Sequence, residues 1–204
     1  MKAQRTRTVI FIDFGGVYFR SSVPIIGKFA KKLGISEKKM YEALMGPNWA
    51  AHVIGKSDEN KYWRYVAEKL NISEKQAYQI RKAWYGYSFP NKGMALLITK
   101  LKKKYTVAAL SSIIIGWVEA LEKKYKISNH FHEHHYTYDH GIDKPSEKFF
   151  LSAAKKMKVK PEDCIVVDDM KVFLDAVKRT GARTILFKNA KQLEAQLRKM
   201  GVEV

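Results

Sequence analysis

Cysteine is almost absent from this sequence, with Cys164 alone among 204 residues. A single thiol excludes an internal disulfide and is typical of proteins from a reducing compartment. Long apolar runs are absent too. No stretch approaches the roughly 20 residues that span a bilayer as a helix, and the apolar run after the basic N-terminus is too short for a signal sequence. We therefore expect a soluble, cytoplasmic protein without a membrane segment.

Acidic residues are scarce relative to basic ones. Asp and Glu total 20 against 38 Lys and Arg, which gives a formal net charge of +18. Such a charge favours anionic partners in general, including phosphorylated metabolites, nucleic acid and acidic surfaces. Most of the basic residues, however, fall on predicted helix surfaces and helix ends, as at 102–104, 123–126 and 155–160. Solvation and helix dipoles account for them, so we favour this interpretation over nucleic-acid binding.

A short apolar run near the start of the chain ends at a carboxylate. Residues 8–17 read TVIFIDFGGV, in which a strand-length run rich in β-branched and aromatic side chains is followed by Asp13, Gly15 and Gly16. This composition predicts a buried strand that ends at a glycine turn. Ligands of open parallel sheets bind outside the carboxyl ends of the strands, and Asp13 stands at such an end.

Residues 20–89 carry the pattern of helices throughout. Pro24 begins a first helix, Ser36 caps a second, Ser57 precedes a third, and Ser73 with Gln76 forms a capping box for a fourth. No strand pattern lies between these four predicted helices. We therefore expect residues 20–89 to form one helical unit, inserted into a core made of residues 1–19 and 90–204.

Beyond residue 90 the pattern alternates between helix and strand. The predicted strands cover 105–110, 164–167 and 183–187, and amphipathic helices separate them. Such alternation predicts parallel strands joined by right-handed helical crossovers. The expected fold class is therefore α/β, with a parallel sheet, helices on both faces and an inserted helical unit. A chain of this length accommodates one core with a small accessory domain.

Three of the predicted strands end in polar residues. Asp13 follows the first strand, Ser111 and Ser112 follow the second, and Asp168 and Asp169 follow the strand at 164–167. In a parallel sheet the carboxyl ends of all strands share one edge, so we expect these side chains to meet there. Lys144, in a loop just before a helix, is a candidate to join them.

This set of groups suits phosphoryl transfer through an aspartyl phosphate. A carboxylate can attack phosphorus, while a metal ion and fixed donors neutralise the charge on the phosphoryl oxygens. Mg²⁺ is the expected cation, because it prefers one or two carboxylates together with water and phosphate oxygens. Lys144 would offset the remaining negative charge, and Ser111 with nearby backbone N–H groups would hold the phosphate.

The ordered motifs resemble those of the haloacid dehalogenase-like (HAD) hydrolase superfamily over nearly the whole chain. The resemblance rests on the hhhDxGGV start, Ser111 at a strand end, GxxKP at 141–145 and hhhhDD at Asp168-Asp169. It implies a Rossmann-like core, with residues 20–89 as the helical cap that many members insert after the first motif. It also implies Asp13 as nucleophile, with Ser111 and Lys144 as catalytic groups. Asp13, Asp168, Asp169 and the carbonyl of Gly15 would then hold Mg²⁺.

Two positions depart from the pattern of the family phosphatases. Gly15 stands where most of them carry a second Asp that acts as general acid and base, a role usually contributing on the order of a hundred- to ten-thousand-fold in rate. Phe173 stands where many relatives have Asn. Members that resemble sugar-phosphate phosphatases, and the phosphatase domain of epoxide hydrolases, also have Gly at the first position. The resemblance thus implies a phosphatase for small phosphorylated metabolites.

Two other interpretations remain open at the level of the sequence. A metal-independent 2-haloacid dehalogenase also lacks the second Asp, although the Asp168-Asp169 pair favours a metal-dependent enzyme. A catalytically silent protein of the same fold that binds anions or nucleic acid would be consistent with Gly15, Phe173 and the charge of +18. We favour the Mg²⁺-dependent phosphohydrolase.

Further candidate residues lie in the cap and in a histidine-rich segment. Trp49 and His52 follow the helix break at Gly46-Pro47, where relatives close the cap over substrate, so we expect substrate contacts from them and from Ser112. Residues 130–140 hold five of the six histidines. Their alternate spacing is compatible with Zn²⁺ ligation or with a strand that has one packed and one solvated face. We favour the structural interpretation.

Overall fold

The computed structural model describes residues 8–204, so residues 1–7 of the predicted core and the basic N-terminus lie outside the described residues. All pairings in the central sheet are parallel, and the strand order is β3-β2-β1-β4-β5. This confirms the expected α/β class. The strands are β1 (Val9–Ile12), β2 (Thr106–Ser111), β3 (Glu133–Tyr136), β4 (Cys164–Asp168) and β5 (Arg183–Leu186).

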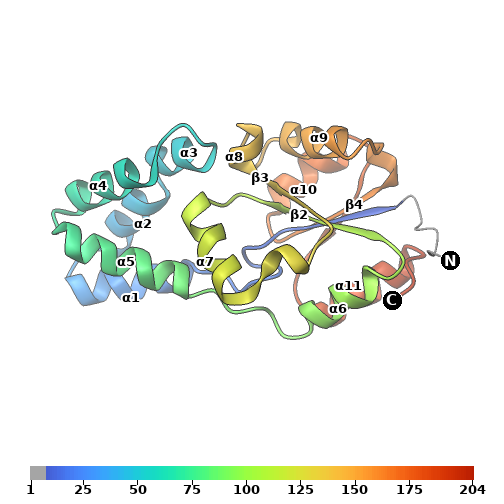
Figure 1. Ribbon diagram of the computed structural model, residues 1–204, viewed down its shortest axis with the longest axis horizontal. Coiled ribbons are helices and arrows are strands. Elements are labelled where there is room, and N and C mark those ends of the chain that lie inside the picture. Colours follow the sequence, from blue (N-terminus) through green and yellow to red (C-terminus); the bar gives the residue numbers. More distant parts are fainter. Residues whose placement is uncertain (1–7) are drawn as a thin grey trace.

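Helices cover both faces of the sheet because side chains of the strands alternate between two apolar clusters. In β1, Ile10 and Ile12 belong to one cluster, whereas Val9 and Phe11 belong to the other. Figure 1 shows α6 and α11 on one face, and α9 and α10 on the other. The helices of this part are α6 (Met94–Leu101), α7 (Ile115–Tyr125), α8 (Thr137–His140), α9 (Glu147–Lys156), α10 (Lys171–Lys178) and α11 (Ala190–Lys199), with short 3₁₀ turns at Ile127–Asn129 and Pro161–Asp163.

A separate group of helices occupies one end of the molecule (Figure 1). These helices have an apolar cluster of their own, to which Ile114 from the sheet part also belongs. They are α1 (Val23–Leu33), α2 (Glu37–Met45), α3 (Pro47–Val53), α4 (Glu59–Leu70) and α5 (Glu74–Gly86). We call α1–α5 the helical unit.

The helical unit has five helices where the sequence pattern predicted four. The additional helix, α3, begins at Pro47 directly after Gly46, whose extended backbone ends α2. A proline needs no N–H donor in a first turn, so Pro47 begins a helix as well as breaking one. The caps at Ser36 and Ser73 are confirmed. Ser57 precedes α4 as expected, and Asp58 caps this helix by accepting a hydrogen bond from the Lys61 N–H. Within residues 8–204, no helix has the length and apolarity needed to span a bilayer.

Candidate active site

The ends of β1, β2 and β4 bring the predicted catalytic groups to one edge of the sheet. Ile12 pairs with Ala109 of β2 and with Val167 of β4, so the residues that follow in each strand lie at the same level. The Asp13 N–H continues the ladder with a hydrogen bond to the Val167 carbonyl, at 3.0 Å. Asp13 and Asp168 therefore come together because of parallel pairing, although they are far apart in the chain.

Lys144 joins the two carboxylates from the loop between α8 and α9. Its Nζ lies 2.7 Å from Oδ1 of Asp13 and 2.6 Å from Oδ2 of Asp168. The three residues are 9 %, 7 % and 1 % exposed, respectively, so this is a buried charge network. Such a network persists only where each charge has a partner, and here one ammonium bridges two carboxylates.

Burial and the repulsion between neighbouring carboxylates shift the pKa values of the residues in this network. Burial raises the pKa of Asp13 to about 7; Lys144 opposes the rise, and the carboxylates of Asp168 and Asp169 add to it. Burial opposes the charged form of Lys144, but the adjacent Asp13 and Asp168 still raise the pKa of this ammonium. The protein alone thus leaves negative charge at the site insufficiently compensated.

Asp169 completes a group of carboxylates suited to a hard cation. One oxygen each from Asp13, Asp168 and Asp169 lies within 4.8 Å of the others, and three carboxylates against one ammonium leave excess negative charge. Asp169 approaches the chain at Gly16, where a Cβ atom would lie 2.0 Å from Oδ2 and where φ is +79°. Only glycine accommodates both features. The residues present therefore fit a divalent cation with oxygen ligands, such as Mg²⁺.

Ser111 and Ser112 lie beside this charge network. Ser111 is buried at the end of β2, and the Ser112 hydroxyl donates a hydrogen bond to the carboxylate of Asp143. The same oxygen of Asp143 accepts the Lys144 backbone N–H at 2.8 Å. Asp143 therefore ties the two loops together. Sequence reasoning missed it, although its place directly before Lys144 in the GxxKP segment was a usable signal.

The aromatic ring of Phe173 packs against the ammonium group of Lys144. The Lys144 Nζ lies 4.9 Å from the centre of the Phe173 ring, and the ring is fully buried in α10. A desolvated ammonium is attracted to an aromatic face. The aromatic side chain at this position thus contacts Lys144 directly, by a cation–π interaction.

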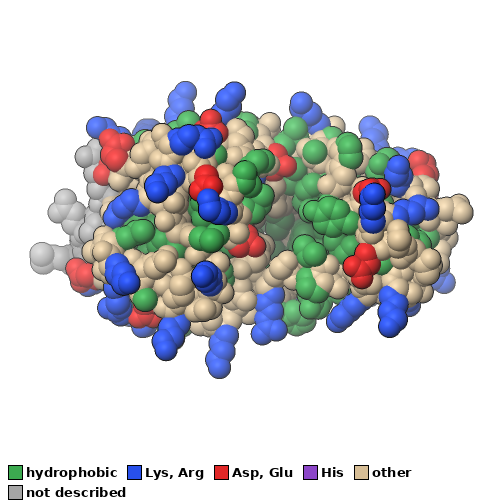
Figure 2. Space-filling model, turned by 180° about the vertical axis from the view of Figure 1, so that it is seen from behind, with side chains coloured by type: hydrophobic (Ala, Val, Ile, Leu, Met, Phe, Trp, Pro, Cys, Tyr) green, Lys and Arg blue, Asp and Glu red, His purple; other side chains and the backbone are tan. Residues whose placement is uncertain are grey.

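A cavity of about 310 Å³ lies between the charged edge of the sheet and the helical unit. The space-filling view shows the surface hollowed between the two parts of the molecule, with hydrophobic side chains around the hollow (Figure 2). The lining residues from the sheet part are Asp13, Gly15, Ser112, Trp117, Asp143, Lys144, Asp169 and Met170. Those from α1–α5 and the segment before α1 are Ser21, Ser22, Val23, Ile26, Met45, Trp49 and Trp84.

The two cap residues singled out in the sequence occupy different positions. Trp49 lines the cavity, whereas His52 is not among its lining residues. His52 is buried in the helical unit, where its ring stacks on Tyr62 at an interplanar angle of 12° and its Nδ1 lies 2.8 Å from the Ser57 carbonyl oxygen. Helical periodicity indicated an apolar environment but did not determine which residue faces the cavity. Trp84 and Trp117, which line it as well, were not recognised as site residues.

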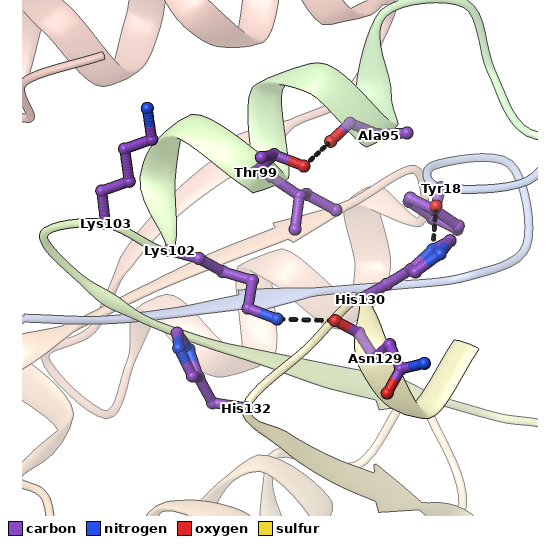
Figure 3. A pocket seen from close by; sticks show the side chains of 9 residues that line it. Tyr18, Ala95, Thr99, Lys102, Lys103, Asn129, His130 and His132 are labelled. Carbon is purple, nitrogen blue, oxygen red and sulfur yellow. Dashed lines mark hydrogen bonds between the residues drawn. The ribbon is translucent and has the colours of Figure 1, made fainter. Parts of the chain in front are cut away.

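A larger cavity, of about 430 Å³, lies elsewhere, against α6 (Figure 3). Lys102, Lys103, His130 and His132 line it together with Tyr18, and no carboxylate does. The hydroxyl of Tyr18 hydrogen-bonds the Nδ1 atom of His130, and Lys102 donates to the Asn129 carbonyl. Because none of the described lining residues carries a carboxylate, this cavity offers neither an aspartyl nucleophile nor acidic ligands for a cation.

The histidine-rich segment forms β3 and its flanks. His132 accepts a hydrogen bond from the Val107 N–H at its Nδ1 atom, His134 contacts the Ile127 carbonyl, and His135 pairs with His140. Within residues 8–204, the Asp13, Asp168 and Asp169 group is the one set of three or more such side chains close enough to share a metal. The described histidines of this segment thus make hydrogen bonds to the backbone or to one another, and they do not form such a group.

A family model described as haloacid dehalogenase-like hydrolase matches residues 7–181. The chain belongs to the haloacid dehalogenase-like hydrolases. It is thus an enzyme of the hydrolase class, as the motifs indicated.

Individual relatives are more distant. The chain is 28% identical over 119 residues to flavin mononucleotide hydrolase 1 of Arabidopsis thaliana, an alignment that covers 58% of this chain and 48% of the relative, about half its length. A HAD family enzyme from Bacteroides thetaiotaomicron superposes with a TM-score of 0.80, at 20% identity, covering 96% of this chain and all of the other. The same enzyme has been solved with magnesium and inorganic phosphate, with a TM-score of 0.74 at 21% identity over 90% and 95% of the two chains.

Proposed function

We propose that this protein is a Mg²⁺-dependent phosphohydrolase that acts on a small phosphorylated metabolite, with Asp13 as nucleophile. The observation that carries the proposal is the buried network in which Lys144 contacts both Asp13 and Asp168 at hydrogen-bond distance. A haloacid dehalogenase acting on carbon needs the nucleophile but has no use for a cluster of three carboxylates. A phosphohydrolase uses the cluster, because a divalent ion there neutralises the phosphoryl oxygens.

The chain's own residues account for the two halves of the reaction. An oxygen of the Asp13 carboxylate attacks phosphorus, the ester P–O bond breaks, and the leaving oxygen takes up a proton. Water then attacks the phosphorus of the aspartyl phosphate, which releases inorganic phosphate with a proton and restores the Asp13 carboxylate. When bound, Mg²⁺ would supply positive charge for the phosphoryl oxygens, held by Asp13, Asp168, Asp169 and the Gly15 carbonyl.

Lys144 and Ser111 serve this reaction by position. The contact of Lys144 with Asp13 favours the ionised, nucleophilic form of the carboxylate against its burial. We assign to Ser111, which is buried at the end of β2, the binding of a phosphate oxygen. The Ser112 hydroxyl donates a hydrogen bond to Asp143. Position 15 is glycine, so the proton for the leaving group comes from another source, such as solvent.

The test is release of inorganic phosphate from 4-nitrophenyl phosphate, followed with Mg²⁺ and with EDTA. Turnover is expected with Mg²⁺ only, and Asp13→Asn should abolish it. Asp175→Asn is a matched control, because Asp175 is an exposed carboxylate on α10 outside the cavity. The proposal fails if the wild type shows no turnover, or if Asp13→Asn behaves like Asp175→Asn. Chloride release from 2-chloropropionate that persists in EDTA would identify a dehalogenase instead.

A further inference from the structure

The wall that the helical unit contributes to the cavity is apolar and aromatic. Trp49 and Trp84 lie with ring centres 5.6 Å apart at 40°, and Trp84 and Trp117 lie 5.2 Å apart at 55°. Ile26 and Met45 extend this surface from α1 and α2. Three tryptophans, contributed by α3, α5 and α7, thus meet around a single cavity. A planar, apolar group in the cavity would lie against this continuous group of aromatic rings.

The hydrogen-bonding groups of these tryptophans are largely directed elsewhere. The indole N–H of Trp84 donates to the Ser22 hydroxyl at 3.0 Å, and that of Trp117 donates to the Ser88 hydroxyl at 2.8 Å. Of the three serine hydroxyls that line the cavity, Ser22 accepts from Trp84 and Ser112 donates to Asp143. A ligand with many hydroxyl groups would therefore lose more hydrogen bonds to water than it regains here.

The electrostatics of the cavity exclude a second class of ligand. Although the chain carries a net charge of +18, the described lining residues include Lys144 as the one cation, against Asp13, Asp143 and Asp169. Lys144 is already occupied by two carboxylates. A leaving group with a further phosphate or carboxylate would meet no counter-charge in the helical wall.

We infer that the enzyme selects phosphomonoesters whose leaving group presents a flat, uncharged aromatic group, and that Trp49, Met45 and Trp117 determine this selectivity. The inference rests on the proposed phosphohydrolase function and names its substrate class. Sugar phosphates and nucleoside polyphosphates are outside that class. A volume of about 310 Å³ is at the lower end of the range for ligand pockets, so the aromatic group is small.

The decisive experiment compares two monophosphates of primary alcohols, 2-(2-naphthyl)ethyl phosphate and glucose 6-phosphate, with the full chain and Mg²⁺. Both break the same kind of P–O bond, so a difference reports on the group bound in the cavity. The expected kcat/KM is about tenfold or more higher for the naphthyl ester, the discrimination usual for a well-buried apolar group. Equal rates, or a preference for glucose 6-phosphate, would overturn the inference and leave the phosphohydrolase proposal standing.

Substitutions in the helical wall test whether its side chains determine the selectivity between the two esters. Met45 is half-buried, and Met45→Gln conserves its length while placing an amide in the wall. We expect it to raise KM for the naphthyl ester about fivefold and to alter KM for glucose 6-phosphate by a smaller factor, so that the preference for the naphthyl ester falls. Met157→Gln is the matched control, since Met157 is also half-buried but lies against another cavity, near β3. Trp49→Leu should reduce the preference further.

The other outcomes of these experiments distinguish failure of the inference from failure of the phosphohydrolase proposal. If Met45→Gln and Trp49→Leu both fold, by their circular dichroism, but change neither ester's KM, the aromatic wall does not bind substrate and the inference is wrong. If neither ester nor 4-nitrophenyl phosphate is hydrolysed by the wild type, the phosphohydrolase proposal and the inference fall together. Activity on 4-nitrophenyl phosphate with selectivity for the polyol would reject the inference alone.

Discussion

The two walls of the cavity differ in both chemistry and origin. The sheet wall carries Asp13, Lys144 and Asp169, which are held by the ends of strands and by one loop. The helical wall carries Trp49 and Met45, which come from short helices. The charged groups to which we assign the reaction are held at the edge of the central sheet. The apolar groups to which we assign substrate selection are held mainly by a unit that has an apolar cluster of its own. Changes in one wall should therefore alter turnover and changes in the other should alter selectivity.

After loss of the nucleophile itself, the largest effect is expected from removing the cation of the sheet wall. Lys144→Met leaves Asp13 and Asp168 buried without a positive partner, which usually costs about 3 kcal/mol or more in the free energy of unfolding. Activity should fall by at least about a hundredfold, because the charge facing the phosphoryl group is lost. Urea unfolding and phosphate release measure the two effects.

The control is Lys171→Met, which removes an exposed ammonium from its pair with Asp175 on α10. It should change the free energy of unfolding by less than about 1 kcal/mol and leave turnover unchanged. If Lys144→Met is as stable and as active as this control, the buried network does not have the role assigned to it.

A gain of activity is expected from restoring an acid to the sheet wall. A Cβ atom built at Gly15 meets no atom within 4 Å, and its φ is not in the left-handed region, so Gly15→Asp fits without strain. A general acid should raise kcat for 2-(2-naphthyl)ethyl phosphate by about tenfold to a hundredfold, and less for 4-nitrophenyl phosphate, whose leaving group needs no proton. Gly86→Asp, at an equally open position outside the cavity, should change neither rate.

Acid sensitivity of the fold should originate outside both walls, at the His135–His140 pair. Nδ1 of His135 lies 3.2 Å from Nε2 of His140. Burial lowers the pKa of both imidazoles to about 4. The positive charge of Lys156 lowers both pKa values further, and His140 also lowers that of His135. Between pH 6.5 and 4 the unfolded chain therefore binds more protons than the folded one. With respect to this pair, the free energy of unfolding should be at its maximum above pH 6.5 and should fall as the pH decreases through this range.

The expected loss between pH 7 and pH 5 is about 2 kcal/mol for each imidazole, or about 4 kcal/mol for the pair, measured by urea unfolding. His140→Gln retains hydrogen bonding but removes one titrating group, so its loss over the same range should be about half as large. An unchanged pH dependence in His140→Gln would place the acid sensitivity elsewhere in the protein.

The smallest effect is expected from weakening the contact between Phe173 and Lys144. Phe173→Leu should lower kcat about fivefold, because the desolvated cation–π contact at 4.9 Å contributes on the order of 1 kcal/mol to placing the ammonium. Phe149→Leu is the matched control: Phe149 is fully buried in the same apolar cluster, and its loss should affect stability but not kcat. Equal kcat values in the two variants would assign Phe173 a packing role only.

The sheet wall was largely predictable from the sequence, whereas the helical wall was not. Asp13, Ser111 and Asp168 each end an apolar run, and parallel pairing makes such ends meet whatever the details of packing. Trp49 and His52 are neighbours on one short helix, yet Trp49 alone lines the cavity. Their positions depend on how α3 packs against α4 and α5, which the period of a helix does not determine.

Other differences have equally local causes. Pro47 was interpreted as a break and in fact begins α3, since a proline ends one helix and begins another with the same missing N–H. The roles of Trp84 and Trp117 depend on contacts between segments far apart in the chain, such as the bond of Trp84 to Ser22. Phe173 departed from the family pattern, and the compensating contact with Lys144 is visible only in three dimensions.

In the proposed reaction Asp13 carries the phosphoryl group during turnover. Acid quenching of the enzyme during hydrolysis of 4-nitrophenyl phosphate with Mg²⁺, followed by mass spectrometry of its peptides, detects this intermediate. The expected result is one phosphoryl group on the peptide that contains Asp13, absent when EDTA replaces Mg²⁺ and absent in Asp13→Asn. A phosphoryl group on another residue, or steady hydrolysis without any modified peptide, would contradict the account.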